Sequence, residues 1–130
     1  MPGLRLRARV SRGFTLIELL VVMAALGLLL AITVPRYTEH VDRAREVVLR
    51  QNLAAVRESI DKFYADRGRY PAALQELVQS RYLRQIPLDP VSDRSDTWVL
   101  IPPTGTSTGV FDLRSGAPGT ARDGSPYASW

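Results

Sequence analysis

The sequence contains no cysteine and only one histidine, His40. The lack of cysteine excludes disulfide frameworks, thiolate metal sites and thiol catalysis. A single imidazole cannot build a histidine-based zinc site or a proton relay. The sequence also lacks a P-loop, a G-x-G-x-x-G run and a G-x-S-x-G elbow. Because none of these catalytic groups is available, we expect a protein that is not an enzyme.

Beyond residue 13 the chain has no excess of positive or negative charge. The formal net charge is +4 at pH 7. Residues 1–13 contain no acid and four arginines, which account for this charge alone: Arg5, Arg7, Arg9 and Arg12. The rest of the chain carries equal numbers of basic and acidic groups. Nucleic-acid binding requires a clustered basic face, and we therefore expect no nucleic-acid partner.

Residues 14–34 form an apolar stretch in which Glu18 is the one charged residue. A helix of this length is about 31 Å long at ~1.5 Å per residue, which matches a hydrocarbon core of roughly 30 Å. The arginine-rich residues before it belong on the cytoplasmic side by the positive-inside rule. We therefore expect a single-pass protein of a bacterial inner membrane, with the rest of the chain in the periplasm.

Three interpretations of this stretch are open. A secretory signal peptide cut after the small residues Ala25 and Gly27 would leave LLLAITV at the new N-terminus, where these apolar residues have no partner. An uncut anchor does not explain Glu18, whose carboxylate costs at least ~2–3 kcal/mol near the bilayer midplane. In the third interpretation, a cut between Gly13 and Phe14 creates an α-amino group one helical turn from Glu18. The opposite charges can then pair, within one subunit or between neighbours.

The run from Gly13 to Glu18, GFTLIE, resembles the processing site of type IV pilins and type II secretion pseudopilins. The resemblance covers the basic leader, the apolar helix and a proline at Pro35. It implies that a membrane prepilin peptidase cuts after Gly13 and N-methylates Phe14. It also implies that Glu18 is needed for assembly, where it meets the N-terminal amine of an adjacent subunit. The leader is then residues 1–13.

The helical pattern continues beyond Pro35, which predicts a kink rather than the end of the helix. An apolar stripe at helical spacing consists of Val41, Ala44, Val48, Leu49, Leu53, Val56, Ile60 and Phe63. The other face predicts a solvated surface and carries Arg43, Glu46, Arg50, Arg57, Glu58 and Asp61. Asp66-Arg67-Gly68 is a stop signal. We therefore expect a transmembrane half at 14–36 and an amphipathic half at 37–66.

Residues 67–130 predict a small periplasmic head. Pro71 suits the first turn of a short helix that ends near Ser80. Residues 97–101 and 109–113 predict two strands joined by a hairpin loop, and the glycine- and serine-rich stretch after them predicts an irregular segment. The expected fold class is α+β and pilin-like, with a long N-terminal helix packed against a short helix and a small antiparallel sheet.

The head resembles the major, G-type pseudopilin of type II secretion. The matching residues are Tyr70-Pro71, Leu74, Leu77, Tyr82-Leu83, Ile86-Pro87, Asp89-Pro90, Phe111-Asp112-Leu113, Ser115-Gly116 and Trp130. G-type pseudopilins carry a calcium site in the loop after the last strand, and calcium requires some six to eight oxygen ligands. The resemblance therefore implies calcium ligands at Asp112, Leu113, Ser115 and Asp123.

Two features of this loop argue against a required cofactor. The family's GxDG acid is missing, because the sequence reads GAPG at residues 116–119, and Arg122 beside Asp123 repels a cation. Arg122-Asp123-Gly124 also forms an ordinary turn without any metal. We expect that no cofactor is required, and calcium binding stays an alternative.

These observations predict a structural pseudopilin subunit that polymerises from the inner membrane into a periplasmic pseudopilus driving type II protein secretion. The expected partners are further copies of the chain, other pseudopilins, the prepilin peptidase, an inner-membrane assembly platform and membrane lipid. Two alternatives are a minor pilin of a type IV or DNA-uptake pilus and a membrane-anchored receptor that does not polymerise.

Overall fold

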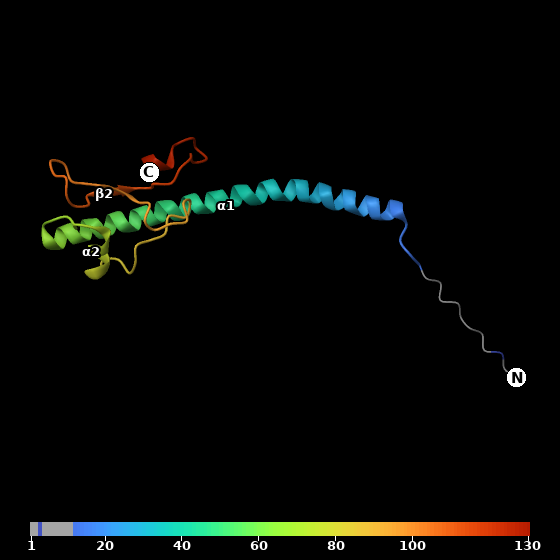
Figure 1. Ribbon diagram of the computed structural model, residues 1–130, viewed down its shortest axis with the longest axis horizontal. Helices are drawn as coiled ribbons and strands as arrows, with labels where there is room; N and C mark the ends of the chain where they lie inside the picture. The colour runs from blue at the N-terminus through green and yellow to red at the C-terminus, as the bar shows by residue number, and fades with distance from the viewer. Residues whose placement is uncertain (1–2, 4–11) are drawn as a thin grey trace. The chain divides into compact units, whose positions relative to one another are not determined.

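The computed structural model describes residue 3 and residues 12–130. The described chain contains the helices α1 (Leu16–Arg67) and α2 (Leu74–Gln79), the strands β1 (Val99–Ile101) and β2 (Asp112–Arg114), and a 3-10 helix, η1 (Tyr127–Ser129) (Figure 1). It divides into two compact units, Met1–Thr38 and Glu39–Trp130, and α1 contributes to both. Most of the predicted leader, residues 1–13, lies outside the described residues.

α1 begins and ends within two residues of the predicted bounds, and it continues through Pro35 as predicted. Proline cannot donate a backbone hydrogen bond within the helix. Close to it, the hydroxyl of Thr33 donates to the carbonyl of Leu29 at 2.8 Å, and that of Thr38 donates to the carbonyl of Pro35 at 2.9 Å. Both hydroxyls are thus satisfied inside the helix. A kink at Pro35 stays a prediction.

The first part of α1 is long and apolar enough to cross a membrane. None of its most apolar window is buried against the rest of the described chain. Exposed leucines and valines follow one another along every side of this segment, for example Leu20, Val22 and Leu29. A helix that is apolar all round is suited to lipid rather than to water. The bounds 14–36 of the transmembrane half stay a prediction.

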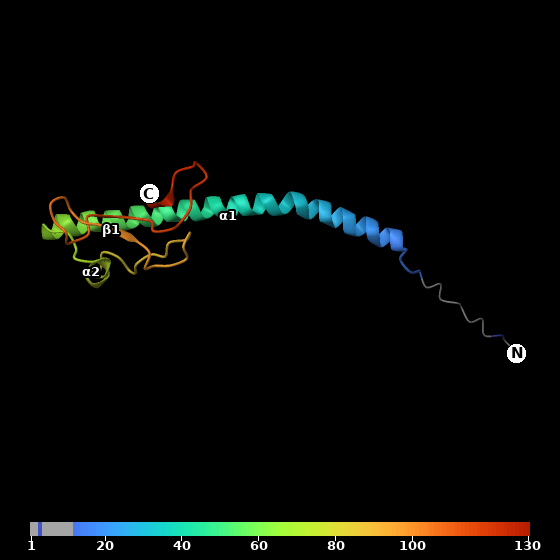
Figure 2. The ribbon, with the colours of Figure 1, turned by 45° about the horizontal axis from the view of Figure 1, so that its top comes forward.

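The core of the second unit is built on the C-terminal half of α1. Its buried apolar side chains are Leu49, Leu53, Val56, Ile60, Phe63, Leu74, Leu77, Trp98, Val110 and Leu113. Figure 2 shows the head segments lying along this green part of α1. The predicted stripe is confirmed from Leu49 onward. Its first three residues are a correction: Val41 is half-buried and Ala44 and Val48 are exposed, because the core of the head begins only at Leu49.

β1 and β2 pair antiparallel with Leu100 opposite Leu113. The predicted hairpin is therefore confirmed, but both strands are shorter than predicted and the second begins later. The reason lies in the preceding loop. Gly109 has a φ of +96°, and the amide of Val110 donates to the carbonyl of Pro71 at 2.8 Å. The chain at Gly109 and Val110 is thus bonded to the segment before α2 instead of to β1.

α2 ends at Gln79, close to the predicted end near Ser80, but it begins later than predicted, at Leu74. Pro71 does not lie in its first turn, as predicted, but before it. The amide of Ala72 donates to the Glu76 carboxylate at 2.7 Å, and the Arg69 guanidinium pairs with the same carboxylate at 2.6 Å. These bonds fix the turn that precedes α2, so the helix begins only at Leu74.

Two tight contacts join the loops of the head. The carboxylate of Asp89 is fully buried and accepts hydrogen bonds from the Ser115 hydroxyl at 2.6 Å and from the amides of Val91 at 2.9 Å and Ser92 at 3.3 Å. The backbone of Gly116 lies so close to Thr97 that a Cβ atom on residue 116 would be 1.9 Å from the Thr97 carbonyl oxygen. Only glycine allows this approach.

We expect Asp89→Ala to lower the free energy of unfolding by about 2–4 kcal/mol, because it leaves a buried hydroxyl and two amides without an acceptor. Urea unfolding of the detergent-solubilised protein, followed by tryptophan fluorescence, measures the change. Asp61→Ala is the matched control, since Asp61 is an exposed acid on α1, and should stay within about 0.5 kcal/mol of the wild type. Equal stability of the two variants would contradict the role of Asp89.

Candidate functional sites

The first candidate site is the segment around Gly13. Residues 12–15 are not helical and are exposed, and Phe14 keeps 88% of its surface accessible. A Cβ atom built on Gly13 would meet no atom within 4 Å. The peptide bond after Gly13 therefore lies in an irregular, accessible part of the chain, directly before α1. This is the kind of backbone that a peptidase can bind.

Thr15 fixes the start of α1. Its hydroxyl accepts a hydrogen bond from the Glu18 amide at 3.2 Å, and its carbonyl accepts one from the Leu19 amide at 3.2 Å. A threonine in this position satisfies one of the free amides of the first turn. The Thr15 side chain therefore caps the first turn of α1. The helix therefore begins within three residues of the predicted cleavage point.

Glu18 lies in the first turn of α1, the only acid of the apolar stretch. Within the described residues its carboxylate makes no hydrogen bond and no ion pair. The N-terminal end of a helix carries a partial positive charge, which favours an acid there. The geometry brings Gly13, Phe14 and Glu18 into one short segment at the end of the apolar helix.

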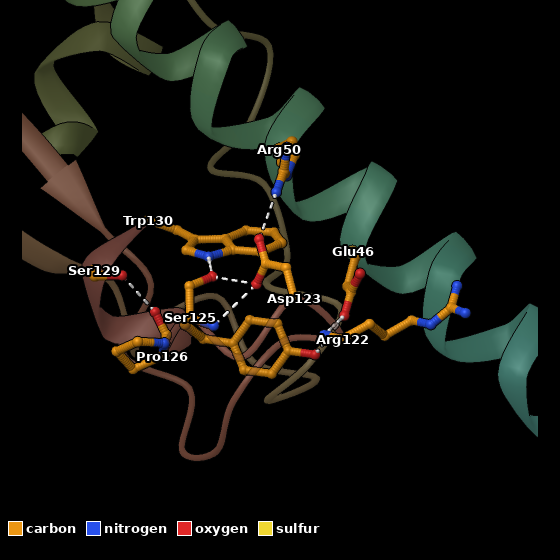
Figure 3. A network of polar contacts seen from close by, with 9 residues as sticks. Glu46, Arg50, Arg122, Asp123, Ser125, Pro126, Ser129 and Trp130 are labelled. Carbon is orange, nitrogen blue, oxygen red and sulfur yellow. Dashed lines mark hydrogen bonds and ion pairs between the residues drawn. The ribbon is translucent and has the colours of Figure 1, made fainter.

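The second candidate site is the C-terminal segment, where calcium ligands are predicted (Figure 3). Glu46 on α1 accepts a hydrogen bond from the Arg122 amide at 2.8 Å and one from the Tyr127 hydroxyl at 3.3 Å. One helical turn further, the Arg50 guanidinium lies 3.7 Å from the Asp123 carboxylate and 4.3 Å from the ring centroid of Trp130. Both residues of α1 thus hold the segment after β2.

Ser125 connects the members of this network. Its amide and its hydroxyl both donate to Asp123, at 2.9 Å and 2.5 Å, and the Trp130 indole donates to the Ser125 hydroxyl at 2.8 Å. The two hydrogen bonds from Ser125, together with the nearby Arg50 charge, hold the pKa of Asp123 below its ordinary value. Asp123 therefore stays ionised in mild acid and keeps its bonds.

A third α1 residue, Arg57, holds the start of β2. Its Nε atom donates to the Asp112 carboxylate at 2.7 Å, and its Nη2 atom donates to the Leu113 carbonyl at 3.0 Å. The Leu113 amide donates to the same Asp112 oxygen at 2.7 Å. One guanidinium therefore bonds a side chain and a main-chain oxygen of adjacent residues.

The four predicted calcium ligands have different hydrogen-bond partners in the structure. Asp112 and Leu113 bond to Arg57, Ser115 donates its hydroxyl to the buried Asp89, and Asp123 faces Ser125. Among residue 3 and residues 12–130, no group of three or more His, Cys, Asp or Glu residues has a geometry that could hold a metal ion.

Sequence reasoning missed the role of three residues on α1. Glu46, Arg50 and Arg57 were predicted to belong to a solvated face, but each contacts the head. They flank the apolar stripe rather than lie opposite to it. The signal that was available is their position: each is three or four residues from Leu49 or Leu53, so each borders the buried face of the helix.

Comparison with known proteins supports the N-terminal site first. Residues 8–34 match the family model described as the prokaryotic N-terminal methylation motif. The match includes Gly13, Phe14 and Glu18, whose individual roles stay predictions.

Similarity to curated proteins extends over most of the chain. Fimbrial protein EcpC of Eikenella corrodens is 29% identical over 90% of this chain and 80% of its own length. Type II secretion system core protein G of Pectobacterium carotovorum subsp. carotovorum is 30% identical over 87% of this chain and 82% of its own length. The chain belongs to the type II secretion system core protein G family. Core protein G of Pseudomonas aeruginosa is 31% identical over 65% of this chain and 71% of its own length. No solved structure matches this pseudopilin significantly.

The lowered pKa of Asp123 predicts how the C-terminal segment of this pseudopilin responds to acid. An acid with a lowered pKa in the fold contributes stability that is present above its ordinary value of about 3.9 and is lost as the pH falls through the lowered value. Trp130 emission should therefore change below about pH 4, as protonated Asp123 releases Ser125 and Arg50. A fluorescence titration of the wild type measures this step, and Asp123→Asn should lack it. The same step in both proteins would contradict the assignment.

Proposed function

We propose that this chain is a structural pseudopilin subunit that polymerises from the inner membrane into a periplasmic pseudopilus driving type II protein secretion. The observation that carries the proposal is the GFTLIE segment, which is accessible, is capped by Thr15 and leads directly into an exposed apolar helix. The membership of the chain in the core protein G family supports a structural rather than a catalytic role.

In this proposal a prepilin peptidase removes residues 1–13 and N-methylates Phe14. The irregular backbone at residues 12–15 supports this step, because the bond to be cut is not held in a helix. The absence of a side chain on Gly13 leaves room for the peptidase at the cleavage position. Removal of the leader places a new amine directly before α1.

Glu18 then supplies the polar contact for assembly. Apolar helices gain little from one another in lipid, so packing and polar pairing must drive their association. An isolated carboxylate in lipid is costly, by at least ~2–3 kcal/mol near the midplane. An amine from the Phe14 of a neighbouring subunit relieves this cost and fixes the axial position of the new subunit. The contact forms only when two subunits meet.

The partners follow from this arrangement. The chain would assemble with further copies and with other pseudopilins on an inner-membrane assembly platform, with residues 1–13 on the cytoplasmic side before cleavage and the head in the periplasm. A cytoplasmic ATPase would supply the energy. The similarity to fimbrial protein EcpC over 90% of the chain favours a pilus as the second candidate; association with the secretion platform or with a pilus in co-purification separates the two.

The intact mass of the protein extracted from membranes tests the processing step. We expect a polypeptide that lacks residues 1–13 and carries one added methyl group on Phe14. Gly13→Leu should keep the leader, whereas Gly3→Leu, a glycine elsewhere in the leader, should be processed like the wild type. A wild-type chain that still begins at Met1, or that begins at Leu28, would exclude the pseudopilin mechanism.

Glu18→Ala tests the assembly contact. We expect normal membrane insertion, because the substitution removes a charge from an apolar helix, but at least about tenfold fewer filaments, since a pairing energy above ~1.4 kcal/mol is lost. Sheared-filament yield and cross-linked ladders in membranes measure assembly. Glu39→Ala, which removes an acid beyond the apolar stretch, is the control. Normal filament yield from Glu18→Ala would refute the pairing.

A further inference from the structure

The contacts of the predicted calcium ligands test whether calcium fits this head. Calcium binds six to eight oxygens at 2.3–2.6 Å, so all ligand oxygens lie within about 5 Å of one another. Here the Asp112 carboxylate and the Leu113 carbonyl bond to Arg57, at 2.7 Å and 3.0 Å. The positive guanidinium already lies against these two oxygens and would repel a calcium ion that approached them. The residues present therefore do not fit a calcium ion.

The two acids among the predicted ligands are held at different levels of α1. Arg57 binds Asp112 and Arg50 lies against Asp123. These arginines are seven residues apart, which corresponds to about 10.5 Å along a helix at ~1.5 Å per residue. Each acid thus has its own arginine partner, in two separate ion contacts with one helix.

The guanidinium of Arg57 lies where a bound cation would lie, between a carboxylate and a main-chain carbonyl. A guanidinium presents donors in a rigid fork, which suits two acceptors that lie side by side. Its two acceptors are a carboxylate and a main-chain carbonyl, the two oxygen types that calcium prefers. The side chains of Arg57 and Asp112 remain 40% and 31% exposed, so the positioning of the donors matters more than charge alone.

The Arg50 contact complements it at the other end of the segment. The Arg50 guanidinium lies over the Trp130 ring and beside the Asp123 carboxylate. Glu46 adds an acceptor for the Arg122 amide. The segment from β2 to Trp130 is thus attached to α1 at two places, by Arg57 at β2 and by Glu46 and Arg50 toward the end of the segment.

We propose that Arg57 and Arg50 act as built-in cations that attach residues 112–130 to α1, and that the head folds and keeps this segment in place without calcium. Arg57 supplies the positive charge between Asp112 and the Leu113 carbonyl, and Arg50 supplies it at Asp123. The proposal concerns the fold of the head, and it holds whether or not the chain polymerises.

The wild type in detergent micelles gives the first test, in excess EGTA and in millimolar calcium chloride. A ligand that binds only the folded state, at a concentration far above its dissociation constant, raises the melting temperature by several degrees. We expect the same melting temperature within about 1 °C in both solutions. Hydrogen exchange of peptides covering residues 112–130 should also agree within about twofold. A calcium-dependent rise of several degrees would overturn the proposal.

Arg57→Gln gives the second test, with Lys62→Gln as its matched control. Lys62 is an exposed cation on α1 that pairs with Glu58 at 2.9 Å and lies outside the contacts to the C-terminal segment. We expect hydrogen exchange at residues 112–114 to accelerate at least about fivefold in Arg57→Gln, and to stay at the wild-type rate in Lys62→Gln. Equal exchange in the two variants would overturn the role of Arg57. If Arg57→Gln does not fold, the calcium response of the wild type decides alone.

Discussion

A polypeptide inside a bilayer must satisfy its backbone hydrogen bonds within the spanning segment, and this constraint makes α1 the element on which the rest of the protein depends. Its apolar part, which contains Glu18 and Pro35, stays helical and even bonds the Thr33 hydroxyl within the helix. From Leu49 onward the same helix supplies the apolar stripe on which the head is built. One element therefore serves two environments, and its sequence changes character between them.

The head uses more of α1 than its apolar stripe. Residues beside the stripe bind the strand pair and the C-terminal segment through charged hydrogen bonds at Arg57 and Glu46 and through an ion pair at Arg50. Exposed ion pairs contribute only ~0–1 kcal/mol each. These contacts matter here because they determine which part of an irregular segment faces the helix. An apolar core alone does not determine this.

The periodic parts of the protein were predictable from the sequence. Local pattern is what sequence reasoning measures. It shows the apolar stretch, the helical spacing of Leu53, Val56 and Ile60, and the short helix of the head. The GFTLIE segment was equally clear, because few folds place one acid at the start of an apolar helix.

The remaining features depend on contacts between distant residues. The late start of β2 follows from the bond between Val110 and Pro71, and the roles of Arg57 and Glu46 follow from groups more than fifty residues away. The local pattern places Arg57 and Glu46 beside the buried face of α1, but it shows neither the groups that they bind nor the bond that delays β2. The contact of Asp112 with Arg57 is a further example, because a resemblance to a family gives residue types but not the side chain that a neighbouring helix places beside them.

The contact between Gly116 and the Thr97 carbonyl has a consequence for sequence variation in the head. Any larger residue at position 116 would push apart the segment before β1, at Thr97, and the segment after β2. The exposed neighbour Arg114 is under no such restriction. The close approach of two main-chain segments, rather than a contact between side chains, therefore restricts position 116 to glycine.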